Sequence, residues 1–162
     1  MWKSTEHLKG EHNRQDIAYA LAAARVFGVS DDAARQAIKG FGGIEHRMEY
    51  VGDFGGVKYY NDSIATIPTA VMGAVKALGN VDTLLFGGLD RGIDYKDFID
   101  FLNTSDVNNF VGLPETGHSI IAELKKMGCN KNMFCAEDMA DAVSICNECT
   151  EKGKSCLFSP AA

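Results

Sequence analysis

The stretch VDTLLFGGLDRGIDYKDFIDFLNTSDVNNFVGL, residues 81–113, decides the fold. Residues 81–86 have the length and apolar character of a buried strand, and a glycine-rich loop follows them. Residues 95–102 then have helical periodicity, and residues 107–113 form a second apolar run. A strand, a helix and a strand in this order predict two parallel strands joined by a right-handed crossover helix.

The same alternation continues outward from this unit. Helical patterns occupy residues 69–78, 117–127 and 136–152, and short strand patterns occupy residues 132–135 and 155–158. The sequence therefore predicts an α/β fold, a Rossmann-like mostly parallel sheet with helices on both faces. In such sheets ligands bind beyond the carboxyl ends of the strands, so the loops that follow strands are the candidate sites.

The residues before this region predict two further units. Residues 48–54 and 57–60 alternate like strands around Gly55-Gly56, which predicts a β-hairpin. Residues 13–27 form an alanine-rich helical pattern, and a second helix is expected from an N-cap at Ser30 to Gly40. We therefore expect an αα-hairpin in residues 1–43 and the α/β domain in residues 44–162.

Composition limits the function classes. The chain has 162 residues, of which 46% are hydrophobic and 23% charged, as is typical of one soluble globular domain with an appendage. The formal net charge of −6 argues against a nucleic-acid partner, because such proteins present a clustered basic face. No apolar run has transmembrane length and no signal-peptide pattern opens the chain, so we expect a cytoplasmic protein without a membrane partner.

The five cysteines are crowded into the last third of the chain, at positions 129, 135, 146, 149 and 156. An odd, clustered set is unlike a disulfide framework and favours reduced thiols. Cys146 and Cys149 form a C-x-x-C pair, but no further ligands stand at zinc-site spacing. We expect both to be ordinary helix residues and expect no metal site.

The loop Asn61-Asp62-Ser63-Ile64-Ala65-Thr66 lies between a predicted strand and a predicted helix. Its polar side chains would stand beside backbone N–H groups at a helix N-terminus, which attract anions. The alternative is that Asp62, Ser63 or Thr66 simply caps the helix. Spacing alone leaves the two interpretations open.

A second loop, Gly87-Gly88-Leu89-Asp90-Arg91-Gly92, has glycines that let the backbone approach a ligand and an arginine whose planar fork suits a carboxylate. It is not a P-loop, because the G-x-x-x-x-G-K-[ST] pattern is absent. By itself such a turn is often only a tight connection.

Three histidine-containing segments are weaker candidates. His46-Arg47 follows the helical hairpin at the predicted domain junction, where clefts commonly hold ligands, although such a pair is also common on protein surfaces. Gly10-Glu11-His12-Asn13 leads into the first helix, and Asn13 could be its N-cap. His118 has no evident partner in the sequence and is expected to be structural or solvated.

Taken together, these motifs resemble the Mur ligase family. The motifs are Gly-x-His-Asn at residues 10–13, His46-Arg47-Met48-Glu49, Asn61-Asp62-Ser63-x-Ala65-Thr66, Gly87-Gly88-x-Asp90-Arg91-Gly92 and Ser159-Pro160-Ala161. The similarity spans residues 8–162. It implies the C-terminal, amino-acid-delivering domain of the member that adds D-glutamate to UDP-N-acetylmuramoyl-L-alanine in peptidoglycan synthesis, through an acyl phosphate and with ATP and Mg²⁺.

The resemblance also assigns roles to residues. It implies nucleotide contacts for Asn13, His46, Arg47 and Asp62, and contacts to D-glutamate for Ser63, Thr66, Arg91 and Ser159. Family members have lysine at the position of Ile64 and asparagine at that of Asp16. No catalytic residue is expected here, because the resemblance places the P-loop and most Mg²⁺ contacts in a central ATPase domain, of which residues 1–43 would be the tail. The domain would also be truncated at its end.

Two alternatives remain on sequence grounds. One is a sibling Mur or folylpolyglutamate-type ligase that adds another amino acid, and the other is a stand-alone Rossmann-like nucleotide-binding module. For the ligase we expect this chain alone to be inactive, and self-association through the exposed hairpin is a hypothesis. The central expectation is that Asp62, Thr66, Arg91 and Ser159 lie at one end of the sheet.

Overall fold

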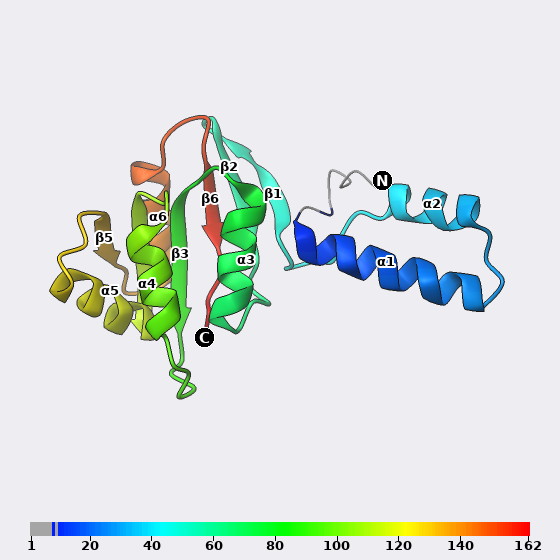
Figure 1. Cartoon of the computed structure of the whole chain (residues 1–162). Helices are drawn as coiled ribbons and strands as arrows, with labels where there is room; N and C mark the ends of the chain where they lie inside the picture. Colours follow the sequence, from blue (N-terminus) through cyan, green and yellow to red (C-terminus); the bar gives the residue numbers. More distant parts are fainter. Residues whose placement is uncertain (1–7, 9) are drawn as a thin grey trace.

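The structure is a computed structural model that describes residue 8 and residues 10–162. One six-stranded sheet has the order β1-β2-β6-β3-β4-β5 (Figure 1). The strands are β1 (Glu49–Phe54), β2 (Val57–Asn61), β3 (Val81–Gly88), β4 (Asn109–Glu115), β5 (Asn132–Cys135) and β6 (Ser155–Phe158). β1 and β2 are antiparallel, and all other neighbouring strands are parallel. The predicted sheet and hairpin are confirmed.

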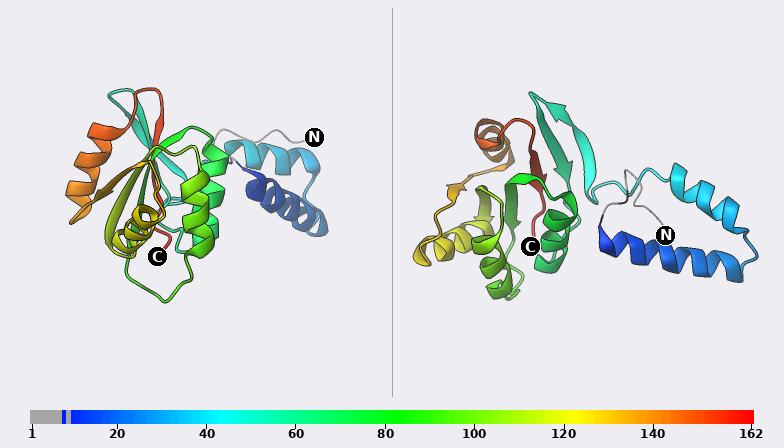
Figure 2. Two further views of the ribbon diagram at one scale, coloured as in Figure 1. Left: turned by 60° about the vertical axis from the view of Figure 1, so that its left-hand side comes forward. Right: turned by 45° about the horizontal axis from the view of Figure 1, so that its top comes forward.

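Helices cover both faces of the sheet, as predicted. The helices α3 (Pro68–Leu78), α4 (Lys96–Thr104) and α5 (Thr116–Lys126) lie on one face, and α6 (Met139–Cys149) lies on the other (Figures 1 and 2). Their order follows from the right-handed crossovers between parallel strands. The face that carries three helices holds the larger hydrophobic core.

The central strand β3 supplies both cores because its side chains alternate between the two faces. Leu84 and Phe86 belong to the larger core, where the Phe86 ring packs edge-on against Phe98 and Phe110 at centroid distances of 5.9 and 6.3 Å. Leu85 belongs to the smaller core beneath α6. Burial on both faces explains the apolar run Leu84-Leu85-Phe86, and the polar residues Asp82 and Thr83 of the same strand are also buried.

The last helix is shorter than its sequence pattern suggests. Residues 136–152 were expected to be helical, but α6 runs only from Met139 to Cys149. The Asp138 carboxylate accepts a hydrogen bond from the Asp141 N–H (2.9 Å) and so caps the helix at that point. Helical periodicity alone does not mark this N-cap, so the predicted start at Ala136 is too early.

The αα-hairpin lies outside the sheet domain, beside β1 (Figures 1 and 2). Its helices are α1 (Glu11–Val26) and α2 (Asp31–Gly40), and Ser30 caps α2 as predicted. Of its described side chains only Ile17 is buried, whereas Tyr19, Val26 and Phe27 are exposed. The domain boundary near Gly43 stays a prediction. Within the described residues, no helix has the length and apolar character that crossing a membrane requires.

Candidate functional site

Three loops meet at the carboxyl ends of β2, β6 and β3, because these strands are neighbours in the sheet. The segment after β6 lies between the other two loops and bonds to both through its backbone. The Ala161 N–H donates to Ala65 O (3.0 Å) in the loop after β2, and the Gly87 N–H donates to Pro160 O (2.9 Å) at the end of β3. The sheet thus brings together the loops that carry the predicted D-glutamate residues.

Asp62 and Ser159 form the buried centre of this arrangement. Asp62 is 4% exposed and Ser159 is fully buried. The Ser159 hydroxyl donates to Asp62 Oδ2 (2.7 Å), and the Met48 N–H donates to Asp62 Oδ1 (3.0 Å). Both carboxylate oxygens therefore accept hydrogen bonds from the protein itself, and Asp62 links the segment after β6 to the segment before β1.

The loop after β2 presents Thr66 to solvent and leaves the start of α3 without a side-chain cap. Thr66 and Ile64 are exposed, and Ser63 is half-buried, with its N–H donating to Asn61 Oδ1 (3.1 Å). The N-cap of α3 is Ile67, whose side chain makes no capping hydrogen bond. The interpretation of Asp62, Ser63 or Thr66 as an ordinary helix cap is therefore wrong, because the loop ends one residue later than a cap by Thr66 would require.

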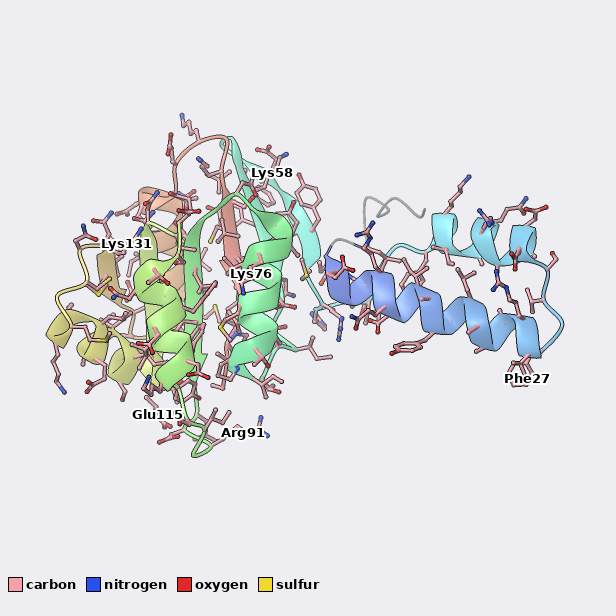
Figure 3. The ribbon with its side chains drawn as sticks, in the orientation of Figure 1. Phe27, Lys58, Lys76, Arg91, Glu115 and Lys131 are labelled. Atoms are coloured by element: carbon pink, nitrogen blue, oxygen red, sulfur yellow. The ribbon has the colours of Figure 1, made fainter. Side chains whose placement is uncertain are left out.

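The loop after β3 carries Arg91 on a projecting turn (Figure 3). The Gly92 N–H donates to Asp90 Oδ1 (2.8 Å), which closes the turn around Arg91. Arg91 is exposed, and among residues 8 and 10–162 no carboxylate forms a salt bridge with it. Its guanidinium is therefore accessible to a carboxylate ligand.

Sequence reasoning missed two residues that hold this loop, Glu115 and Thr116. The Asp90 N–H donates to Glu115 Oε2 (2.9 Å). The Thr116 hydroxyl accepts from the Gly88 N–H and donates to Gly88 O, both at 3.0 Å. Their only signal in the sequence is that they follow the strand next to β3.

The segment His46-Arg47-Met48 joins the helical hairpin to this site. His46 Nδ1 lies 2.9 Å from Asn61 Nδ2, and the Ile64 N–H donates to His46 O (3.2 Å). His46 and Met48 have positive φ values of 64° and 47°, which are uncommon for residues other than glycine. The predicted nucleotide-binding segment and the loop after β2 are therefore directly hydrogen-bonded.

A cavity of about 610 Å³ lies between the hairpin and this segment. Asn13 and Asp16 of α1 line it together with Arg47, so two of the predicted nucleotide residues share one cavity. Asn13 lies inside α1, whose N-cap is Gly10, so the alternative that Asn13 is the cap is wrong.

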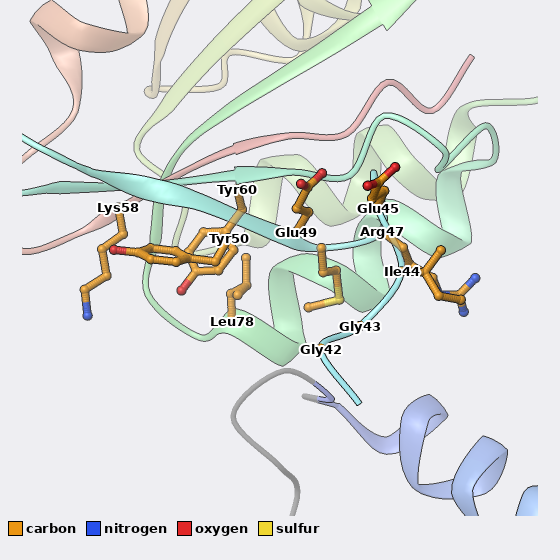
Figure 4. Close-up of a pocket in the computed structure, with 11 residues that line it drawn as sticks. Gly42, Gly43, Ile44, Glu45, Arg47, Glu49, Tyr50, Lys58, Tyr60 and Leu78 are labelled. Atoms are coloured by element: carbon orange, nitrogen blue, oxygen red, sulfur yellow. The ribbon is translucent and has the colours of Figure 1, made fainter. Parts of the chain in front are cut away.

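A second cavity of about 480 Å³ also borders Arg47 and continues over β1 and β2. In Figure 4 Tyr50, Tyr60 and Lys58 form one end of its lining, and Arg47 lies at the other. Arg47 thus faces two hollows that could hold a nucleotide.

The remaining candidates have structural partners. His118 Nε2 lies 2.9 Å from Ala136 O, so His118 has a structural partner, which is one of the two roles expected for it. All five cysteines are free, and Cys146 and Cys149 lie on α6. Burial raises the pKa of the Cys149 thiol, and a hydrogen bond with Cys156, followed by burial, raises that of Cys146. In the described part of the chain no three His, Cys, Asp or Glu side chains gather as metal ligands.

Comparison with known proteins places this geometry in a family. Residues 46–162 match the family model described as Mur ligase, glutamate ligase domain. The chain is 37% identical to the UDP-N-acetylmuramoylalanine--D-glutamate ligase of Lachnoclostridium phytofermentans, over 93% of this chain and 33% of that protein. It is also 37% identical to the ligase of the same name from Geobacillus kaustophilus, over 95% of this chain and 34% of that protein.

A solved structure supports the same fold. UDP-N-acetylmuramate-alanine ligase MurC from Thermotoga maritima superposes with a TM-score of 0.74 at 17% identity, over 94% of this chain and 35% of MurC. The chain spans about a third of the length of the curated relatives it matches. From the family model over residues 46–162, together with the mostly parallel sheet and its three converging loops, we conclude that the chain belongs to the Mur ligase family.

Proposed function

We propose that this chain is the amino-acid-delivering domain of a cytoplasmic, ATP-dependent ligase that adds D-glutamate to UDP-N-acetylmuramoyl-L-alanine. The observation that carries the proposal is the meeting of three loops at one end of the sheet, with Thr66 and Arg91 exposed around the buried pair Asp62 and Ser159. The names of the curated relatives support both substrates, UDP-N-acetylmuramoyl-L-alanine and D-glutamate.

The proposal divides the site into two parts. Thr66 and Arg91, with Ser63 beside them, contact D-glutamate, and Arg91 binds one of its carboxylates through a bidentate pair. Ser159 shapes this part through its bond to Asp62. Asn13, His46 and Arg47 face the nucleotide. Asp62 supports them indirectly, because its carboxylate accepts the Met48 N–H and so fixes the backbone between the two parts.

The work of this domain in such a ligase is positioning. The acceptor amine must reach an acyl phosphate formed from ATP, and holding it in place removes much of the entropic barrier. The described residues offer no acidic cluster that fits Mg²⁺. As the family resemblance implies, we expect Mg²⁺ to be held mainly by the central ATPase domain together with the ATP phosphates.

A substrate panel on the full-length gene product tests the proposal. With ATP, Mg²⁺ and UDP-N-acetylmuramoyl-L-alanine, we expect phosphate release with D-glutamate to exceed that with L-glutamate, D-alanine or L-lysine by about a hundredfold or more. Efficient turnover of another amino acid would assign the protein to a sibling ligase. ATP binding without any ligase turnover would favour a nucleotide-binding module.

The chain of 162 residues alone provides the companion measurement. Because it lacks a P-loop, we expect no phosphate release that depends on both ATP and D-glutamate. Detection of such release by the purified chain would show that it holds the chemistry as well as the positioning.

A further inference from the structure

Glu115 has a backbone conformation that a non-glycine residue rarely adopts. It is the last residue of β4 and the N-cap of α5, with φ 63° and ψ −100°. Such conformations cost free energy and persist where the surrounding structure fixes them, and they are enriched at functional sites. The contacts that fix the Glu115 backbone, and the loop that its carboxylate binds, therefore indicate what Glu115 does.

The N-terminus of α5 is fixed against the sheet through glycine contacts. A Cβ atom on Gly117 would lie 2.8 Å from Phe86 O and 2.9 Å from Gly112 Cα, so the helix approaches β3 and β4 more closely than any side chain would allow. Glu115 stands immediately before this helix start. Its position relative to the sheet is thus set by backbone packing.

The Glu115 carboxylate transmits this position to the loop after β3. Glu115 Oε2 accepts the Asp90 N–H (2.9 Å), and Asp90 Oδ1 accepts the Gly92 N–H (2.8 Å). Arg91 is the residue between these two bonded amides. Figure 3 shows Glu115 near the base of the loop and Arg91 at its projecting end.

The carboxylates of Glu115 and Asp90 do not pair with the guanidinium of Arg91. Glu115 and Asp90 both accept backbone amides, and neither forms a salt bridge with Arg91 within the described residues. The loop is held firmly while the guanidinium stays available. This arrangement suits an arginine that must meet a ligand carboxylate in one defined position.

We propose that Glu115 is a positioning residue that fixes Arg91 over the acceptor site and thereby sets the affinity for the carboxylate of the incoming amino acid. This inference rests on the proposed function. It concerns the Michaelis constant for the acceptor, because Glu115 touches neither the nucleotide-binding segment nor the reacting amine.

Three variants of the full-length ligase test the inference. Glu115→Gln keeps an oxygen that can accept the Asp90 N–H, and we expect its KM for D-glutamate to stay within about twofold of the wild-type value. Glu115→Ala and Glu115→Gly remove the acceptor, and we expect each to raise KM for D-glutamate about tenfold, the loss typical of one charge-assisted hydrogen bond. The kcat and the KM for ATP should change by less than about twofold in all three.

The glycine variant separates the carboxylate from the backbone conformation. Glycine adopts φ 63° without strain, so Glu115→Gly should fold at least as well as the wild type even if Glu115→Ala does not. Glu123→Ala is the matched control, because Glu123 is an exposed carboxylate on α5, the helix that follows Glu115, and within the described residues its one salt bridge is to Lys126. This control should leave every constant unchanged.

Several results would overturn the inference. They are an unchanged KM for D-glutamate in the glycine variant, an equal loss in the glutamine variant, a parallel rise in KM for ATP, or an unfolded glycine variant. By contrast, a wild-type enzyme that does not use D-glutamate would refute the proposed function itself, so the two failures are distinguishable.

Discussion

Replacing Arg91 by alanine in the full-length ligase is expected to lower kcat/KM for D-glutamate about a hundredfold. Arg91 lies on one of the three converging loops, and its guanidinium is exposed. Within residues 8 and 10–162 it forms no salt bridge. Hydrogen bonds to charged groups are worth about 1.5–3 kcal/mol, and the alanine variant loses the whole bidentate pair. Steady-state kinetics with varied D-glutamate measure the loss.

Arg91→Lys is the informative companion. Lysine keeps the charge but not the bidentate geometry, so we expect a loss of about tenfold, between the wild-type and alanine values. Arg35→Ala is a suitable control, because Arg35 is an exposed arginine of α2, away from the three loops. Equal kcat/KM values for Arg91→Ala and the wild type would remove Arg91 from the acceptor site.

Replacing Asp62 by alanine is expected to lower the free energy of unfolding of this chain by about 3 kcal/mol. The substitution leaves the Met48 N–H and the Ser159 hydroxyl without the acceptor that both now share, in a place that is almost closed to water. Each buried donor left unsatisfied costs about 1–3 kcal/mol. Urea-induced unfolding followed by circular dichroism measures the change.

Asp53→Ala is the matched control for this measurement. Asp53 also accepts a backbone N–H, from Gly56 at 3.1 Å, but it lies on the exposed β1–β2 turn. We therefore expect a loss below about 1 kcal/mol. If Asp62→Ala were no more destabilising than Asp53→Ala, the Asp62 carboxylate would not be the link between the loops.

The sheet could be predicted from sequence because its elements carry local signals. β3 is buried on both faces and carries the apolar run Leu84-Leu85-Phe86, and α2 begins after a serine that caps it. Parallel order then follows from the alternation of strands and helices. The start of α6 was missed because helical periodicity does not mark the N-cap, which is Asp138.

The bonds within the site could not be predicted, because they join residues far apart in the chain. Ser159 and Asp62 are separated by 97 positions, and Met48 reaches Asp62 through its backbone N–H, which no side-chain pattern reveals. The sequence motifs indicated which loops matter but treated Asp62 and Ser159 only as ligand contacts. The structure adds that their side chains bind each other.

The β3–α4 loop illustrates the same limit. Its glycines and Arg91 were evident, whereas its attachment to Glu115 depends on a backbone conformation with positive φ. Glycine commonly signals such a conformation in a sequence, and glutamate does not. Residues that position a ligand-binding group are therefore harder to find from sequence than the group itself.

The central claim is that the loops after β2, β3 and β6 together bind the acceptor amino acid. A crystal structure of the full-length gene product with D-glutamate and ADP tests it most directly. We expect D-glutamate at the carboxyl ends of these strands, with one carboxylate hydrogen-bonded to Arg91 and another group within hydrogen-bond distance of Thr66. D-Glutamate bound elsewhere, with Arg91 and Thr66 both left in solvent, would contradict it.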